Sequence, residues 1–209
     1  MLTIWGRNTS INVQKVMWAI GELGLAHRRI DVGGSFGKNR EPDYLAKNPN
    51  GLVPVLEEDD GFTMWESNSI VRYLADRHDP DGILAPRDPQ MRARAQMWMD
   101  WQLSVLQPSQ FAAFWGLIRT APEKRDAAAI KASQEKNTAA MTILNGELAR
   151  TPYVAGESFS YGDIPVALNT YRYWTVVPEH PPLPHVRRWY DAVSARPAFQ
   201  KHIAVVPLS

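Results

Sequence analysis

The stretch NPNGLVPVLEEDDGFTMWESNSIVRYLADRH, residues 48–78, carries signals for a turn, two short strands and a helix. Turn-forming residues fill Asn48 to Gly51, and the apolar run at 53–56 contains a proline, which cannot donate to a sheet ladder and so predicts a strand's first residue. The sequence Asp59-Asp60-Gly61 predicts a hairpin to a second apolar run. Apolar residues at helical spacing follow Glu66-Ser67. The predicted order is therefore turn, strand, strand, helix.

The residues before this stretch predict a strand, a helix, a second strand and a short helix. Residues 2–5 are apolar and β-prone, and residues 11–24 carry an amphipathic helical pattern that ends near a glycine. Residues 28–32 form the second predicted strand, and Pro42 is typical of the first position of a helix. The resulting order β-α-β, α, β-β-α is typical of a thioredoxin-like α/β domain with a sheet between helices.

Beyond a short aperiodic linker, every long segment has a helical pattern. Asp88-Pro89 is a helix cap followed by proline, and opens a long helix with a predicted kink at Pro108. An alanine-rich helix is predicted from Pro122, and Ser160 to Asp163 has the spacing of a capping box before a buried helix. Two shorter helices close the chain. The predicted domains are an α/β domain at residues 1–79 and an all-α domain at residues 88–209.

Composition narrows the class of function. The 209 residues are 44% hydrophobic, with 23 basic and 22 acidic side chains, and no basic run long enough to follow nucleic acid. No apolar run approaches about 18 residues and no secretory pattern opens the chain, so we expect a cytoplasmic protein without a membrane partner. Because the sequence has no cysteine, it predicts no disulfide, and its five histidines lack metal-ligand spacing, so no metal is expected.

The motifs NPxGxVPVL, the Asp/Gly hairpin and ES-x-x-I-x-x-YLA together resemble the glutathione-binding half of the glutathione S-transferase family. The resemblance implies a cis peptide bond before Pro54, and implies that the backbone of Val53 meets the cysteinyl part of glutathione. It also implies that Glu66 and Ser67 hold the γ-glutamyl end. Leu52 departs from the family pattern, because many relatives carry a lysine there. Taken singly, Pro54 could be an ordinary trans proline and Ser67 a helix cap.

Ser10 lies where the first loop enters the first predicted helix. A hydroxyl there can donate to a ligand thiolate, while the helix N-terminus adds positive potential. The sequence T-S-x-N-V-x-K-V resembles serine-type and bacterial members of the family, which implies that Ser10 is the thiolate partner, with Asn12 the second candidate and Thr9 the third. The alternative is that Ser10 only caps the helix.

Other candidate residues complete the expected site. Lys38 and Asn39, in a glycine-rich loop, could meet the glycyl carboxylate of glutathione. The resemblance implies that Asp100, in the tryptophan-rich segment Trp98 to Trp101, lies where a dimer partner reaches the site. Such closely spaced indoles on one helix would need cover from a neighbouring domain or a second subunit. Among the apolar residues that follow on this helix, we favour Phe111 and Trp115 for the wall of an electrophile pocket, although such a stripe is more often core.

The sequence thus predicts a cytoplasmic, homodimeric glutathione transferase of detoxification type, which adds the glutathione thiolate, as co-substrate, to apolar small-molecule electrophiles. Two alternatives stay open. The same thiolate could reduce disulfides or peroxides, or the protein could be a non-catalytic ligand-binding or scaffold member of the fold.

Overall fold

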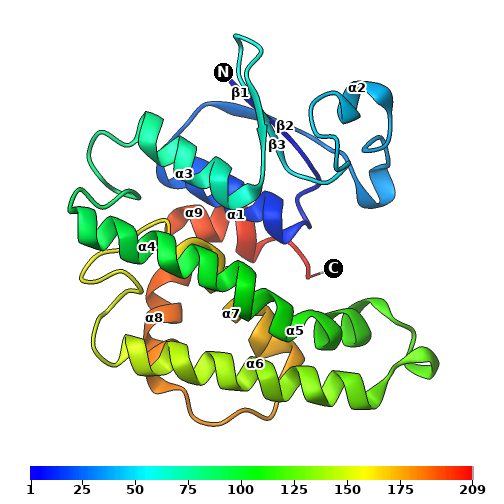
Figure 1. The fold of residues 1–209 in the computed structure, drawn as a ribbon, viewed down its shortest axis with the longest axis vertical. Coiled ribbons are helices and arrows are strands. Elements are labelled where there is room, and N and C mark those ends of the chain that lie inside the picture. Colours follow the sequence, from blue (N-terminus) through cyan, green and yellow to red (C-terminus); the bar gives the residue numbers. More distant parts are fainter. Residues whose placement is uncertain (209) are drawn as a thin grey trace. The chain divides into compact units, whose positions relative to one another are not determined.

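A computed structural model describes residues 1–208, which form two compact units (Figure 1). The first unit comprises Met1–Ala85 together with Arg196–Leu208, and the second runs from Pro86 to Ala195. The predicted all-helical domain, residues 88–209, included the C-terminal segment. The structure differs there, because that segment packs with the first unit.

The first unit is built on a four-stranded mixed sheet with the order β2-β1-β3-β4. β1 pairs in parallel with β2, whereas β3 is antiparallel to both β1 and β4. This sheet and the helices around it confirm the predicted α/β fold class. The strands are β1 (Leu2–Trp5), β2 (His27–Ile30), β3 (Val55–Glu57) and β4 (Thr63–Trp65).

Two helices of the first unit, α1 (Ile11–Glu22) and α3 (Ser67–His78), pack against each other, while the short α2 (Pro42–Leu45) lies apart from them (Figure 1). The apolar face of α1 is fully buried, which places this helix in the core of the unit. Gly24, at a φ of 62°, ends the α1 segment in the left-handed conformation that glycine adopts without steric cost.

The C-terminal segment packs against the end of α1 and is hydrogen-bonded to it. It contains α9 (Pro197–Phe199) and a π-helical turn, Gln200–Ala204. The Arg196 guanidinium donates to both carboxylate oxygens of Glu22, at 2.8 and 2.7 Å, and the Trp18 indole donates to the same carboxylate at 2.8 Å. Phe199 also meets the Trp18 ring edge-on, with the centroids 5.0 Å apart. Side chains from both ends of the chain therefore converge on Glu22.

The second unit is helical, as predicted. Its first helix is capped by Asp88, whose carboxylate accepts from the backbone N–H groups of Gln90 and Met91 at 3.0 and 2.9 Å. Within residues 1–208, no helix has the length and apolar character needed to cross a membrane. The helices are α4 (Pro89–Trp101), α5 (Gln107–Phe114), α6 (Ala127–Leu148), α7 (Asp163–Val176) and α8 (Pro184–Ser194).

Two details of the helix boundaries differ from the sequence prediction. A π-helical segment, Gln102–Leu106, joins α4 to α5, so the helical path changes just before Pro108. Pro122 begins only a 3₁₀ turn, whereas α6 begins after Asp126, whose carboxylate accepts from the backbone N–H of Ala129 at 2.9 Å. The start of α6 is set by this cap.

Asp163, the first residue of α7, is buried and accepts four hydrogen bonds. The donors are the backbone N–H and hydroxyl of Ser160, at 2.8 and 3.2 Å, the backbone N–H of Val154 at 3.0 Å, and the Trp189 indole of α8 at 2.8 Å. The contact between Ser160 and Asp163 confirms the predicted capping-box pairing. Burial raises the pKa of the Asp163 carboxyl to about 6, and the four donors oppose that rise.

We expect Asp163→Asn to lower the free energy of unfolding by about 3 kcal/mol, because an amide has one acceptor oxygen and its N–H₂ group would face donors. Urea denaturation would measure the loss. Asp126→Ala is the matched control, since it removes an exposed cap with a single hydrogen bond and should cost about 1 kcal/mol. Equal losses in both variants would contradict a structural role for the buried carboxylate.

The same residue predicts a pH dependence. Its pKa rises from 3.8 to about 6 on folding, so between these values the folded chain holds the proton more tightly than the unfolded chain. The contribution of Asp163 to stability is therefore complete below about pH 4 and falls as the pH rises through 6. The difference in unfolding free energy between wild type and Asp163→Asn should accordingly shrink from pH 4 to pH 7.

Candidate active site

One row of residues across the sheet defines the candidate site. Trp5 pairs with Ile30 on one side and with Val55 on the other, and Val55 pairs with Trp65. Since β1, β2 and β4 end at this row and β3 begins there, four connecting segments leave the sheet at the same place. We call this place the Trp5 end of the sheet.

The Trp5 end gathers most of the predicted glutathione-binding residues. These residues come from four places in the sequence, and the parallel and antiparallel pairings alone bring them to one place. They are Ser10 after β1, Lys38 and Asn39 after β2, Val53 and Pro54 before β3, and Glu66 and Ser67 after β4.

Ser10 is the N-cap residue of α1 and is 8% exposed. Its backbone is extended, and its side chain makes no capping hydrogen bond. The N–H groups of the first turn leave positive potential beside this hydroxyl. Nearby on α1, the side-chain oxygen of Asn12 is buried without a hydrogen-bond partner. Thr9 is half-buried.

Val53 lies between the loops that contain Gly6 and Gly33. Its peptide bond to Pro54 is cis, which confirms what the resemblance implied. A Cβ atom placed on Gly6 would lie 3.2 Å from the Val53 Cβ and 2.4 Å from a methyl group of Val13. A Cβ atom on Gly33 would lie 3.3 Å from a Val53 methyl group. Gly6 and Gly33 have φ values of 151° and 80°, so backbone conformation and space both favour glycine there.

Side chains hold the loop before Val53 by donating hydrogen bonds to its backbone carbonyl groups. The Leu52 carbonyl accepts from the Tyr44 hydroxyl at 2.7 Å and from the Asn48 amide at 2.8 Å. Burial raises the pKa of Tyr44 to about 12, so its phenol stays a donor at neutral pH. The Asn39 amide donates to the Gly51 carbonyl at 2.7 Å. One of the two Asn39 amide hydrogens is therefore already used within the loop.

Glu66 occupies the N-cap position of α3 with a φ of 71° and a ψ of 104°. Its exposed side chain does not cap the helix, and Ser67, which is buried, is the first helical residue. Ser67 is therefore not the cap that the alternative reading required. Among residues 1–208, Glu66 and Lys38 are the non-glycine residues with positive φ, a conformation that costs of order 1–3 kcal/mol and is frequent at functional sites.

The second unit exposes the two aromatic residues favoured for the electrophile pocket. Phe111 and Trp115 are 61% and 47% exposed, and their rings stack with centroids 5.5 Å apart at an angle of 23°. Phe114, by contrast, belongs to the core. Asp100 is exposed on α4.

In the tryptophan segment of α4, one of the two indoles is buried within the chain. The Trp98 ring meets Trp101 edge-on with the centroids 4.8 Å apart, and Trp98 is only 5% exposed. Of the two kinds of cover that were expected, a neighbouring part of the chain or a second subunit, Trp98 has the first, because residues of its own chain already bury it.

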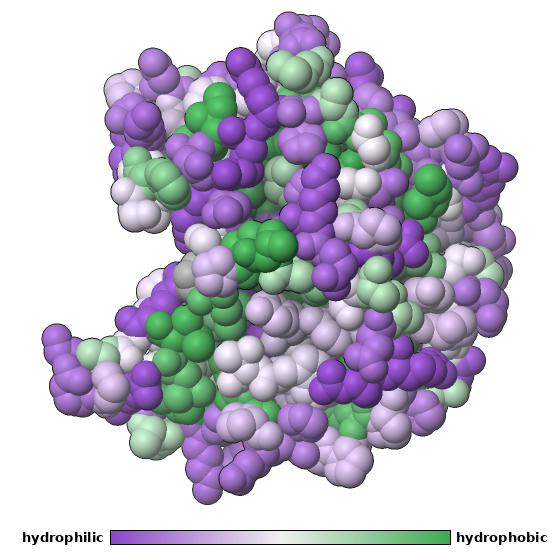
Figure 2. Space-filling view, turned by 180° about the vertical axis from the view of Figure 1, so that it is seen from behind, coloured by the Kyte–Doolittle hydropathy of each residue, from purple (hydrophilic) through white to green (hydrophobic). Residues whose placement is uncertain are grey.

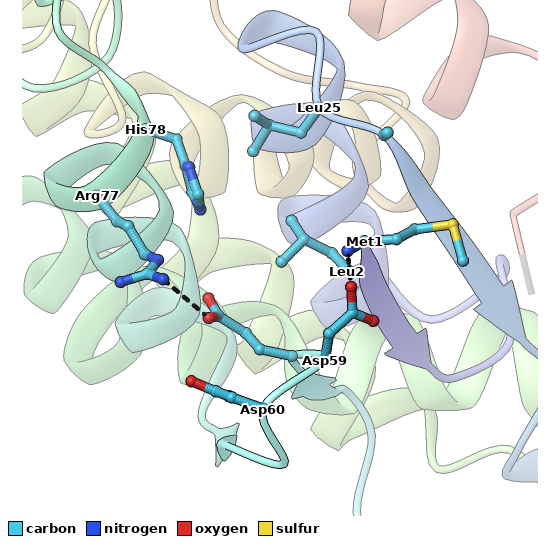
Figure 3. Close-up of a pocket in the computed structure, with 9 residues that line it drawn as sticks. Met1, Leu2, Leu25, Asp59, Asp60, Arg77 and His78 are labelled. Carbon is cyan, nitrogen blue, oxygen red and sulfur yellow. Dashed lines mark hydrogen bonds and ion pairs between the residues drawn. The ribbon is translucent and has the colours of Figure 1, made fainter.

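A cavity of about 430 Å³ in the first unit is separate from the candidate site (Figure 3). It is lined by Met1 and Leu2 at the start of β1, by the hairpin at 58–60, and by Arg77 and His78 at the end of α3. The close-up marks two ion pairs among the lining residues, one between Arg77 and Glu58 and one between the Met1 ammonium and Asp59. Because Leu2 begins the strand that ends at Trp5, this cavity lies at the opposite end of the sheet.

The sequence reasoning missed the residues that support the Trp5 end. Arg29 of β2 donates to the Gly6 carbonyl at 2.8 Å and so ties down the loop that leads to Ser10. Asn48, Gly6 and Gly33 support the segments around Val53. Local sequence offers no signal for Arg29, which has the pattern of an ordinary strand residue, whereas the glycines could have been questioned for positive φ.

Comparison with known protein families shows to which family the chain belongs. Residues 9–77 match the family model for the N-terminal domain of glutathione S-transferase, and residues 101–197 match the model for its C-terminal domain. The chain belongs to the glutathione S-transferase family. These matches confirm the resemblance read from the motifs around Val53 and Glu66.

Individual relatives of this family member align with all or nearly all of its length. Glutathione S-transferase GstB of Escherichia coli K12 is 41% identical, with all of both chains aligned, and glutathione S-transferase 3 of Zea mays is 31% identical over 99% of this chain and 95% of its own. Among solved structures, the theta class glutathione S-transferase from Xanthomonas axonopodis pv. citri with glutathione bound is 40% identical, with a TM-score of 0.93 over 100% of this chain and 99% of its own.

Proposed function

We propose that the protein is a glutathione transferase that adds the glutathione thiolate to apolar electrophiles. The observation that carries the proposal is the convergence of Ser10, Val53 and Glu66-Ser67 at the Trp5 end of the sheet. It is supported by the similarity to an enzyme whose solved structure contains glutathione. The proposed setting is the cytoplasm, and the proposed role is detoxification.

In the proposed reaction Ser10 stabilises the thiolate rather than abstracting a proton. Its hydroxyl donates to the glutathione sulfur, and the N-terminus of α1 adds positive potential. A free thiol has a pKa near ~8.5, and lowering it by about 2 units requires roughly 2.7 kcal/mol of preferential thiolate stabilisation. A charge-assisted hydrogen bond plus a helix N-terminus can supply this amount. The thiolate then attacks the electrophile directly.

The remaining groups hold the tripeptide by charge and by backbone. Ser67 and the backbone N–H groups at the start of α3 take the γ-glutamyl carboxylate, and Glu66 takes the ammonium. The backbone of Val53 pairs with the cysteinyl residue. Lys38, which is exposed, takes the glycyl carboxylate, with a smaller share for Asn39 because its amide already holds Gly51.

The proposed assembly is a two-fold homodimer in which Asp100 of one chain meets the ammonium held by Glu66 of the other. Support comes from the family and from large apolar side chains left exposed on both units, among them Trp65 of β4 and Met97 of α4. Figure 2 shows one face of the molecule on which apolar side chains form separate patches among hydrophilic ones. Such patches commonly mark interaction surfaces.

The first test is the pH dependence of turnover with 1-chloro-2,4-dinitrobenzene and glutathione. Ser10→Ala should raise the pKa of bound glutathione and lower the rate near neutral pH, while glutathione affinity stays within a few-fold. Thr9→Val tests the third candidate and should keep the wild-type profile if Ser10 holds the thiolate. An unchanged profile in Ser10→Ala would move the thiolate role to Asn12. A parallel panel of disulfides and hydroperoxides would reveal reductase activity, and no turnover with any substrate would favour a binding role.

Calorimetric titration with glutathione tests the γ-glutamyl site. Glu66→Gln and Ser67→Ala should each weaken binding by roughly 1–3 kcal/mol, the range for a hydrogen bond to a charged group. Ser69→Ala, in the same first turn of α3, is the control and should bind as wild type. Wild-type affinity in both site variants would remove the γ-glutamyl end from this helix.

Light scattering at micromolar concentration tests the homodimer, and we expect twice the chain mass of 23.6 kDa. Asp100→Ala should leave the mass unchanged and weaken glutathione binding. A monomer with full conjugating activity would overturn the shared site, whereas a dimer indifferent to Asp100→Ala would keep the assembly and exclude that residue.

A further inference from the structure

We propose that Phe111, Trp115 and Arg119 select flat aromatic electrophiles that carry an anionic substituent, such as a carboxylate or sulfonate. The inference rests on the proposed transferase function and adds a substrate class to it. The edges of the Phe111 and Trp115 rings would meet the face of the aromatic ring, and the Arg119 guanidinium would pair with the anion.

The three residues form one row on the helix. They follow each other at intervals of four positions, across the end of α5 and into the π-helical segment Trp115–Arg119, a spacing that puts side chains on a common face. The Phe111 and Trp115 rings are nearly parallel and are both exposed. Because Phe111 stacks on Trp115 and the Arg119 guanidinium lies over the Trp115 ring, a planar ligand can lie across the exposed edges of the two rings, in an edge-to-face arrangement, without moving a core residue.

Positive charge gathers at the C-terminal end of this row. The Arg119 guanidinium carbon lies 4.6 Å from the Trp115 ring centroid and 5.5 Å from that of Phe114. The Arg172 guanidinium of α7 lies 3.9 Å from the same Phe114 ring. An arginine over a ring keeps its full charge, and its planar fork suits a carboxylate better than a point charge would. The row therefore ends in the Arg119 guanidinium, while the Arg172 guanidinium lies on the neighbouring core ring of Phe114.

The opposite side of the helix is fixed to α6, which holds the row outward. A Cβ atom on Gly116 would lie 2.7 Å from Ile130 side-chain atoms, so the two helices touch closely there. The Ser133 hydroxyl donates to the Ser109 carbonyl at 2.7 Å and accepts from the Ala113 N–H at 3.0 Å. These contacts preorganise the row, which lowers the cost of binding a rigid ligand.

The turn after Arg119 is also fixed. The Arg125 guanidinium donates to the carbonyls of Leu117 and Thr120, at 2.9 and 3.1 Å. A second arginine thus closes the end of the π-helical segment, and Arg119 is presented from an anchored backbone.

The chemistry needs no further reactant. The glutathione thiolate attacks the ring carbon that carries a halide, a carbon–sulfur bond forms, and the carbon–halogen bond breaks as the halide leaves with the electron pair. The anionic substituent takes no part in these bonds. Its pairing with Arg119 lowers the barrier only by positioning the ring.

The test compares two aryl chlorides with saturating glutathione, the anionic 4-chloro-3,5-dinitrobenzoate and the neutral 1-chloro-2,4-dinitrobenzene. In Arg119→Gln, kcat/KM for the benzoate should fall about 10- to 100-fold, as for loss of a charge-assisted hydrogen bond, while the neutral substrate changes less than about twofold. Lys124→Gln, which removes another nearby cation from the helical unit, should leave both values unchanged. Arg119→Lys should restore part of the preference.

The outcomes separate the two proposals. If the protein turns over the neutral chloride and Arg119→Gln keeps the wild-type ratio of kcat/KM for the two chlorides, the anionic-substrate proposal is overturned. The transferase function then still stands. Equal losses in Arg119→Gln and Lys124→Gln would also overturn it, since they would indicate general electrostatic attraction. Wild type that conjugates neither chloride would overturn the transferase function together with the inference built on it. Turnover of the neutral substrate also reports that each variant is folded.

Discussion

The register of the four-stranded sheet is the constraint on which the candidate site depends. The paired row Trp5, Ile30, Val55 and Trp65 makes three strands end and one begin at the same place. A slip of one residue in any pair would turn side chains to the other face and displace the segment that follows. The site is thus assembled by backbone pairing before any side chain takes part.

The helix that carries Ser10 is secured at its far end by residues from the end of the chain. Arg196 and Trp18 share the Glu22 carboxylate, whose side chain is nearly buried, with 7% of it exposed. Buried charges are tolerated where geometry and hydrogen bonds compensate for lost solvation, and the bidentate pair meets that condition. Because a helix is stiff, holding its C-terminal end also limits the movement of Ser10 at the other.

The candidate site combines strain with support. Lys38 and Glu66 adopt positive φ angles, which is unfavourable for residues with a Cβ atom. The neighbouring carbonyls of Gly51 and Leu52 are held by side chains of Asn39, Tyr44 and Asn48. A strained backbone persists only where its surroundings determine it, and here the surrounding loops do so.

The sequence by itself determined the order of strands and helices and, through the motifs around Val53 and Glu66, the family, because turn chemistry and apolar periodicity are local signals. Only the tertiary structure decided that the Ser10 hydroxyl does not cap its helix, that Trp98 is covered within the chain, and that α6 begins after Asp126. It also decided that the C-terminal segment packs with the first unit, through Arg196 and Glu22, which are 174 positions apart. A pairing at that separation leaves no trace in local pattern, since its free energy arises only when the folded chain brings both side chains together.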